Sequence, residues 1–217
     1  MKTCDAKSPE STSRAPPFLS GLLCLLLAGC ASHSNTPPIP TPGSGIVEFR
    51  DITQQAHRSV ATMVDSLQTV AREPARADAD FDRAFNDLEL TSMKARSRAE
   101  ALIARGQNYF DEWKEHLAAT NQRSTQGDYD RLYNHFTGIR ERAGEVREEF
   151  RPFMASLRQF RAQLDQPASA GATNRPSPDD IDALTASGRR VLKNLDSLSV
   201  ALDAAEGELR VQQALKR

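Results

Sequence analysis

Apolar residues recur at alternating steps of three and four through most of the chain after residue 44, the pattern of an apolar stripe along a supercoiled α-helix. Four segments carry the pattern, at about 44–72, 78–120, 125–164 and 178–215. At about 1.5 Å per residue, a segment of 40 residues makes a helix about 60 Å long. The pattern therefore predicts an all-α protein, an elongated antiparallel helical bundle or coiled coil of three long helices plus a shorter N-terminal helix.

Local signals support these boundaries. Pro74 ends the first segment, and Asp78 is a candidate N-cap for the second. The run Ser177-Pro178-Asp179-Asp180 combines an N-cap serine, a proline at the first helical position and acidic residues in the first turn. Pro152 lies inside the third segment, where we expect a local bend that leaves the helix unbroken.

The sizes of the stripe residues predict how the helices pair. If the second and third segments fold back on each other about residues 122 and 123, Phe153 faces Ser92. If the third and fourth fold about residues 170 and 171, Phe153 faces Gly188. A large ring would then lie against two small residues, which favours close packing. We therefore expect Phe153, Gly188 and Ser92 to specify the core.

The N-terminal part has the features of an export signal. Residues 18–27 form a ten-residue apolar run after a segment with three basic residues, too short to span a bilayer. The next residues, Leu27-Ala28-Gly29-Cys30, resemble the lipobox of bacterial lipoproteins. This resemblance implies a signal peptide over residues 1–29 and lipidation of Cys30. The alternative is that an ordinary peptidase cuts nearby and leaves a soluble protein.

Residues 30–45 are expected to form a lipidated tether, with the helical domain at 46–215. The tether contains four prolines and almost no charge, which is typical of an extended linker. Ala31 stands where an aspartate would retain a lipoprotein in the inner membrane of enterobacteria, so we expect outer-membrane delivery facing the periplasm. Acyl chains on Cys30 would hold the protein on the membrane without a spanning helix.

Charge and motifs exclude several function classes. The 28 basic and 29 acidic residues nearly cancel, so nucleic acid is not an expected partner. Arginines recur along the third segment, but interleaved glutamates favour a salt-bridged surface over a polyanion site. Phosphate-binding loops, G-x-S-x-G and H-E-x-x-H are absent from the sequence. We expect no enzymatic activity, no catalytic residues and no cofactor.

Two groups of side chains remain as candidates for binding. Glu112 and His116 stand four residues apart on one helix face, a spacing that can hold a metal, but it occurs once and on a charged face, so no metal site is expected. Tyr109 and Tyr133 belong to an aromatic group near the turn at residues 121–124 and lie off the main stripe. They are therefore a candidate contact surface.

Three stretches occur together: Phe81-Asp82-Arg83-Ala84-Phe85, residues 105–113 ending in Tyr-Phe-Asp-Glu-Trp, and residues 146–153 ending in Phe-Arg-Pro-Phe. Their order and spacing resemble an uncharacterised bacterial family of secreted coiled-coil proteins, domain of unknown function twenty-nine fifty-nine, over roughly residues 48–212. The resemblance implies an all-helical envelope protein, often with a lipoprotein signal. It implies no catalytic residues.

Together these features predict a non-enzymatic lipoprotein that faces the periplasm and acts as a helical spacer or docking module for an unknown envelope protein. The alternative is a helical-bundle carrier of a small ligand or metal, held where Gly106, Ala143 and Gly188 would leave space between helices. Apolar stripes can pair within one chain or between chains, so a homo-oligomer stays open as well.

Overall fold

The computed structural model describes residues 43–73, 78–120, 125–165 and 176–215. In these residues it contains four α-helices and no strand: α1 (Gly43–Arg72), α2 (Asp78–Thr120), α3 (Gln126–Leu164) and α4 (Pro178–Leu215). The predicted all-α fold is confirmed, and all four helices match the predicted segments closely. The signal peptide, Cys30 and the tether up to residue 42 lie outside the described residues.

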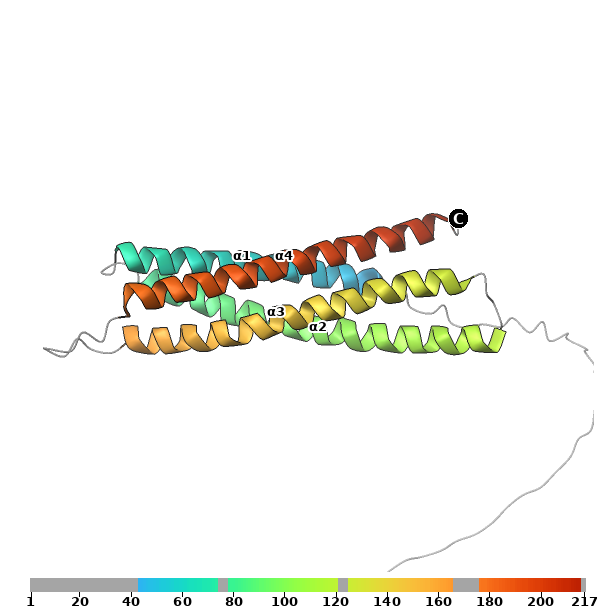
Figure 1. Cartoon of the computed structure of the whole chain (residues 1–217), viewed down its shortest axis with the longest axis horizontal. Coiled ribbons are helices and arrows are strands. Elements are labelled where there is room, and N and C mark those ends of the chain that lie inside the picture. Colours follow the sequence, from blue (N-terminus) through green and yellow to red (C-terminus); the bar gives the residue numbers. More distant parts are fainter. Residues whose placement is uncertain (1–42, 74–77, 121–124, 166–175, 216–217) are drawn as a thin grey trace, which may run out of the picture. The chain divides into compact units, whose positions relative to one another are not determined.

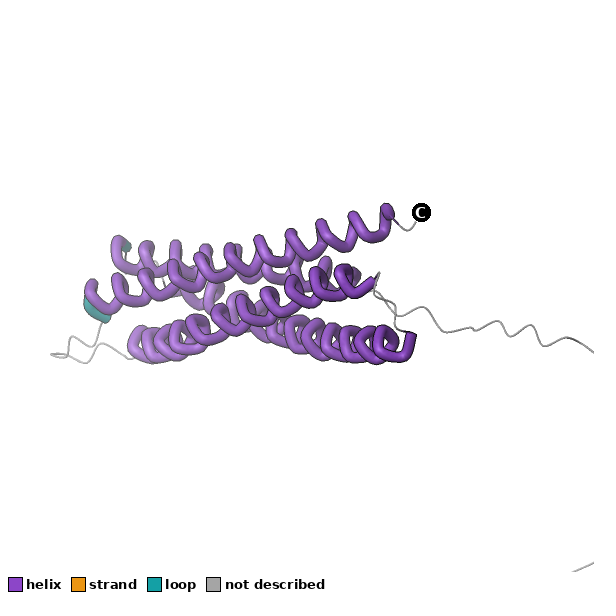
Figure 2. The backbone as a smooth tube through the Cα atoms, turned by 45° about the vertical axis from the view of Figure 1, so that its right-hand side comes forward, coloured by secondary structure: helices purple, strands orange, loops and turns teal. Residues whose placement is uncertain are grey.

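The four helices form one bundle in which each helix packs on two others. α1 packs against α2 and α4, and α3 packs against α4 and α2. Successive helices run in opposite directions, so that the start of α1, the end of α2, the start of α3 and the end of α4 lie at one end of the bundle (Figure 1). Figure 2 shows the same four helices as a tube, with the connections drawn in grey. The apolar stripes therefore pair within one chain.

The start of α1 corrects one predicted boundary. The tether was expected to reach residue 45, although the apolar pattern began at about residue 44, and the structure begins α1 at Gly43. A Cβ on Gly45 would lie 3.2 Å from the Leu102 side chain, and one on Gly43 would lie 4.0 Å from Leu209. Gly45 therefore lies close against α2, whereas the space at Gly43 would accommodate a Cβ. Close packing thus outweighs the low helix propensity from which a loop was predicted.

Two clusters of buried side chains fill the bundle, one toward each end. The first includes Met63 and Leu67 from α1, Phe81 from α2, and Phe153 and Leu157 from α3, all with at most 1% of their surface exposed. The second joins the start of α1 to the end of α4 and to the α2–α3 hairpin. Its members are Ile46, Phe49, Leu102, Phe110, Leu132, Phe136, Ile139, Leu198, Leu202, Ala205 and Leu209.

The predicted neighbours Phe153 and Gly188 are in contact. Two ring carbons of Phe153 lie 3.2 and 3.3 Å from the position that a Cβ on Gly188 would take, and Val64 of α1 lies 2.5 Å from that position. The ion pair Arg190–Glu149, 3.1 Å, joins α4 to α3 at the same register. The antiparallel α3–α4 register read from the sequence is therefore the one that forms, and Val64 is a neighbour that it did not reveal.

The seam between α2 and α3 is less well covered in its middle. Ala95 and Ala99 on α2, and Ala143, Val146 and Phe150 on α3, continue the apolar stripes but are only half-buried. α2 and α3 pack on each other less extensively than the other neighbouring helix pairs do. α2 and α3 consequently bury their stripes mainly toward the two ends of the hairpin.

Polar groups also join the helices inside the bundle. The Ser59 hydroxyl of α1 donates to the Asp87 carboxylate of α2 at 2.6 Å, and its oxygen lies 3.3 Å from the Thr91 hydroxyl. Ser59 and Thr91 are buried. Because each finds a hydrogen-bond partner, these buried hydroxyls favour one register of α1 on α2.

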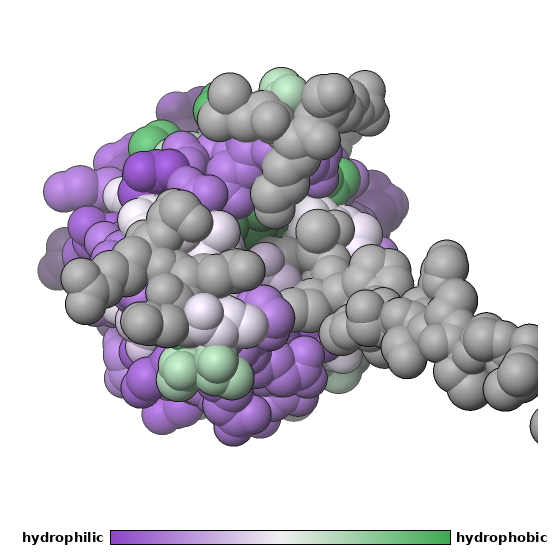
Figure 3. Space-filling view, turned by 90° about the vertical axis from the view of Figure 1, so that its right-hand side faces the viewer, coloured by the Kyte–Doolittle hydropathy of each residue, from purple (hydrophilic) through white to green (hydrophobic). Residues whose placement is uncertain are grey.

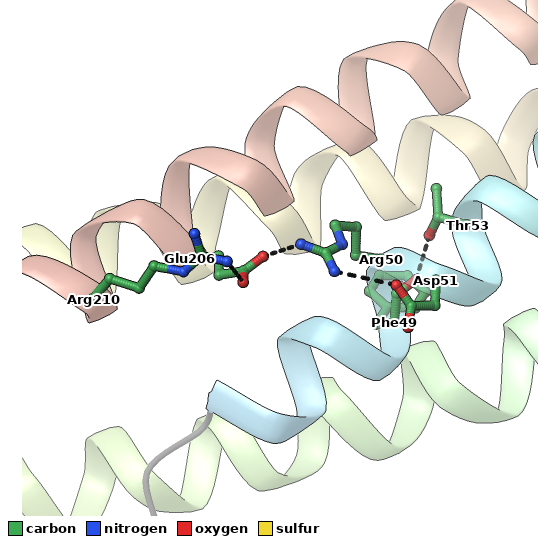
Figure 4. A network of polar contacts seen from close by, with 6 residues as sticks. All are labelled: Phe49, Arg50, Asp51, Thr53, Glu206 and Arg210. Carbon is green, nitrogen blue, oxygen red and sulfur yellow. Dashed lines mark hydrogen bonds and ion pairs between the residues drawn. The ribbon is translucent and has the colours of Figure 1, made fainter. Parts of the chain in front are cut away.

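An ion-pair network joins the start of α1 to the end of α4 (Figure 4). The Glu206 carboxylate accepts hydrogen bonds from Arg50 of α1 and Arg210 of its own helix, and Arg50 also pairs with Asp51. Only 13% of the Glu206 side chain is exposed. This network fixes the helix that begins next to the tether onto the rest of the bundle.

The predicted cap at the start of α4 is confirmed, and so is the predicted continuity of α3 at Pro152. The Asp180 backbone N–H donates to the Ser177 hydroxyl at 3.1 Å, and the Ser177 N–H donates to the Asp180 carboxylate at 3.0 Å, so the start of α4 is capped from both sides. The Ser177 hydroxyl also donates to the Asp180 carboxylate at 2.8 Å, and this hydrogen bond, followed by the one from the Ser177 N–H, lowers the pKa of Asp180. α3 runs unbroken through Pro152.

Candidate contact surface at the end of the α2–α3 hairpin

The last turns of α2 and the first turns of α3 carry all three tyrosines and the single tryptophan of the chain. Together with two phenylalanines they form one aromatic group, which we call the aromatic end. Its members are Tyr109, Phe110, Trp113, Tyr129, Tyr133 and Phe136. The sequence placed five of these rings near one turn, and the antiparallel hairpin brings them together.

The rings contact one another in series across the two helices. Phe110 is buried at the centre, with its ring centroid 5.3 Å from Tyr133 and 5.2 Å from Phe136. Trp113 of α2 meets Tyr129 of α3 edge to face at 5.5 Å. Edge-to-face contacts of this kind are favourable beyond the area that they bury. The aromatic end is therefore a packed, ordered surface.

The two predicted contact residues both lie in this group and both are half-buried. Tyr109 meets Trp113 at 5.6 Å, and Tyr133 stacks on Tyr129 at 5.6 Å. Burial raises the pKa of Tyr109 above its ordinary value of 10.0. Each ring thus packs on its neighbours with one part and meets solvent with another.

Carboxylates border the rings. The pKa of Tyr129 is raised by burial first, and then by the nearby Tyr133, Asp111 and Asp130. Asp111 accepts hydrogen bonds from the amide of Gln107 at 3.0 and 3.2 Å, and Asp130 accepts one from Gln126 at 2.9 Å. Both donors are neutral amides, so these hydrogen bonds do not pair either carboxylate with a cation.

The described residues 107–120 and 126–131 contain five acidic and two basic side chains. Of the two bases, Arg131 pairs with Asp128 and with Glu208 of α4, whereas Lys114 is exposed. Seen end-on, this part of the bundle shows pale side chains of intermediate hydropathy among hydrophilic ones, beside residues drawn in grey (Figure 3). The surface is therefore aromatic with an acidic border.

The interior below the aromatic end is filled. Three ring carbons of Phe136 occupy the space that a side chain on Gly106 would take. A cavity of about 20 Å³ lies beside them, lined by Ile46, Leu102, Phe110, Leu132, His135, Phe136, Ile139, Ala205 and Leu209. That volume is about enough for one water molecule. The glycines on which the carrier hypothesis rested are thus covered by Phe136 at one site and by Phe153 and Val64 at the other.

The titratable candidates do not form a metal site in the described part of the chain. Glu112 and His116 are both exposed, and within the described ranges no three His, Cys, Asp or Glu residues are grouped so as to hold a metal ion. His57 pairs with Asp196 at 3.1 Å, and His135 lines the small cavity. His33 lies outside the described residues.

Most of the arginine stripe on α3 is salt-bridged. Arg142 pairs with Glu145, Arg158 with Glu89, and Arg161 with Asp82, at 2.8 to 2.9 Å. Arg161 also lies over the Phe85 ring at 5.0 Å. These pairs occupy the arginines with carboxylates of the chain itself.

A shallow groove of about 350 Å³ lies between α3 and α4, away from the aromatic end. Among its lining residues, Asp180 caps α4 and Arg190 pairs with Glu149. Its charged groups therefore have structural partners.

The residues that were expected to specify the core are Ser92, Phe153 and Gly188. Ser92 is half-buried, and its hydroxyl donates to the carbonyl of Glu89 at 2.7 Å. Phe153 and Gly188 meet in the first core cluster. Sequence reasoning missed the buried pair Ser59–Thr91 and the contact of Phe136 with Gly106.

Comparison with known proteins finds no match among family models, curated proteins or solved structures. Across the described residues, no helix is both long and apolar enough to cross a bilayer.

Proposed function

We propose that the chain is a lipid-anchored protein of the bacterial cell envelope, without enzymatic activity, whose helical bundle serves as a spacer or as a docking module for another envelope protein. The observation that carries the proposal is the sequence Leu27-Ala28-Gly29-Cys30 directly before a proline-rich stretch and a helical bundle. Under this proposal Cys30 is the lipidated first residue of the mature chain, on the periplasmic face of the outer membrane. The proposed family is domain of unknown function twenty-nine fifty-nine.

The packing of the bundle supports a spacer or docking role over a carrier role. Gly106 and Gly188 carry no side chain, but neighbouring side chains fill the space beside each of them. Three helices of 38 to 43 residues have lengths of about 57 to 65 Å. Long helices with a filled core suit a protein that holds surfaces apart or presents a surface.

The position of α1 relates the proposed anchor to the bundle. Gly43 follows Cys30 by thirteen positions, a length of chain that reaches at most about 45 Å. α1 begins toward the same end of the bundle as the end of α2 and the start of α3 (Figure 1). Under this proposal the anchor is joined to the bundle at the start of α1.

Metabolic labelling with a clickable fatty acid tests the anchor. The chain is expected to incorporate the label and to sediment with outer membranes, and Cys30→Ser should abolish both. Cys24→Ser is the matched control, because it changes a leader cysteine and leaves the lipobox intact. Labelling that survives in Cys30→Ser, or no labelling in the native chain, would refute the lipoprotein assignment.

Crosslinking in living cells followed by mass spectrometry tests the docking role. A reproducible envelope partner is expected with the native chain, and its recovery should fall with Cys30→Ser. Failure to recover any reproducible partner would leave the anchor intact and contradict the docking role.

A further inference from the structure

We propose that the aromatic end binds a cationic segment of a partner protein, with an arginine or lysine side chain placed near Tyr129, Asp111 and Asp130. This proposal deepens the docking role proposed above and names the chemistry of the partner. It rests on three observations: where the chain places its tyrosines and tryptophan, how those rings are exposed, and which charges surround them.

The first observation is the placement of the amphipathic rings. Elsewhere in the bundle the buried rings are phenylalanines, such as Phe49, Phe81 and Phe153. Tyr109, Tyr129, Tyr133 and Trp113, which are all the tyrosines and tryptophans of the chain, are half-buried at one end. Rings with a polar group and a partly exposed apolar body are enriched in protein interfaces.

The second observation is that this surface needs no rearrangement to bind. Trp113, Tyr129 and Tyr133 hold one another at centroid distances of 5.5 and 5.6 Å, and buried Phe110 supports them from below. Rigid aromatic side chains lose little conformational entropy when a partner docks on them. The rings are therefore pre-organised as contact groups.

The third observation is the charge beside the rings. Asp111 comes from α2 and Asp130 from α3, and both lie close enough to Tyr129 to raise its pKa, after the larger effect of burial. Their hydrogen-bond donors, Gln107 and Gln126, are neutral. Within the described ranges no lysine or arginine pairs with Asp111, Asp130, Glu112 or Glu115. A guanidinium or ammonium group beside Tyr129 would meet two carboxylates and an aromatic ring.

The same charges argue against two other occupants. Phospholipid surfaces with anionic headgroups would be repelled by carboxylates at this end. A second copy docked end to end would bring Asp111 and Asp130 against the same acidic residues, and such like-charge contacts are unfavourable. A cationic protein segment is the occupant that charge complementarity favours.

The fluorescence of Trp113 can report peptide binding directly, since Trp113 is the only tryptophan of the sequence and lies in the proposed site. The chain from residue 31 contains the complete bundle and can be titrated with short peptides in which arginine, lysine or glutamate alternates with glycine. We expect the arginine and lysine peptides to change the Trp113 emission saturably, with affinity falling as salt is added. The glutamate peptide should have no effect.

Two variants with the same change in charge separate a local site from a general attraction. The double variant Asp111→Asn and Asp130→Asn should bind the arginine peptide with about tenfold lower affinity, because both neighbouring carboxylates are lost. Asp65→Asn with Asp182→Asn removes two exposed charges from the opposite end of the bundle and should leave the affinity unchanged. Thermal melts of both variants check that the fold is retained.

The proposal is overturned if the glutamate peptide binds as well as the arginine peptide, if no peptide perturbs Trp113 at millimolar concentration, or if both double variants lose affinity equally. An emission change on vesicles of mixed zwitterionic and anionic lipid, without any response to cationic peptides, would assign the surface to the membrane instead. None of these outcomes depends on lipidation of Cys30, so a failed anchor and a failed docking site are distinguishable.

Discussion

The Phe136 ring of α3 lies directly over Gly106 of α2. A Cβ on Gly106 would come within 2.7 and 2.8 Å of two of its ring carbons, closer than carbon atoms approach in proteins. The contact lies between the aromatic end and the rest of the second core cluster. It therefore fixes how near α2 and α3 come to each other below the proposed docking surface.

Gly106→Ala is expected to destabilise the bundle by about 1–3 kcal/mol, because the added methyl group must displace the Phe136 ring. Urea unfolding monitored by circular dichroism measures the loss. Gly144→Ala on α3 is the control, since a Cβ there meets nothing within 4 Å, and it should be neutral or stabilising by up to about 1 kcal/mol. If Gly106→Ala and Gly144→Ala change the free energy of unfolding equally, helix propensity rather than packing determines the effect at position 106.

Gly188→Leu should lower the melting temperature for the same reason at the other core cluster. Phe153 and Val64 already occupy the space beside Gly188, so a leucine overpacks the core. A loss of about 2 kcal/mol would lower the melting temperature by roughly 4–8 °C in a domain of this size. Gly207→Leu is the control, because Gly207 lies on an open face of the same helix. Its melting temperature should fall by no more than about one or two degrees. An unchanged melting curve for Gly188→Leu would contradict the α3–α4 register.

Ser177→Ala should cost about 1 kcal/mol, because the start of α4 loses its capping hydroxyl. The cap also lowers the pKa of Asp180, so its stabilising effect is present above the ordinary pKa of an aspartate and is lost as the pH falls through the lowered value. The difference between the native chain and Ser177→Ala should therefore shrink under acidic conditions. A difference that stays constant from neutral to acidic pH would contradict this linkage.

Alkaline pH should destabilise the aromatic end. The pKa values of Tyr109 and Tyr129 are raised in the folded chain, chiefly by burial, so folding favours their neutral forms. This contribution is full below about pH 10 and is lost as the pH rises through the raised values. Because every tyrosine of the chain is here, tyrosinate absorbance reports this group alone. A folded chain that titrates like the urea-unfolded chain would show this prediction to be wrong.

Glu206→Gln should loosen the first turns of α1, because Arg50 and Arg210 lose the carboxylate that lies between them. We expect a lower melting temperature in dilute salt and a smaller loss at high salt, where charge interactions are screened. A double-mutant cycle with Arg50→Gln measures the coupling, which should be favourable. Additive effects of the two substitutions would show that the pair contributes nothing.

The sequence predicted the helices because their apolar stripes and end signals agree. The α3–α4 register followed from one large residue, Phe153, and one missing side chain, Gly188. The regular stripe of α3 also predicted burial that its middle does not achieve, since Val146 and Phe150 are only half-buried where α2 and α3 pack least extensively. Stripe position alone does not report the size of the facing residues.

The aromatic end was visible in the sequence only as rings near one turn. Its acidic border depends on which of several acids lie beside Tyr129, and that depends on the rotation of α2 against α3. Likewise, the tether was expected to include Gly45, because its close contact with Leu102 belongs to another helix. These features are non-local, and a pattern along one helix does not contain them.

The contact of Phe136 with Gly106 also constrains how chains of this kind can diverge. Any homologue that carries a side chain at the position of Gly106 must carry a smaller residue at the position of Phe136, or else its hairpin must open. The two positions should therefore co-vary in an alignment, as should Gly188 with Phe153 and Val64. Correlated substitutions at these positions would indicate that the distance between the helices is maintained as the sequences diverge.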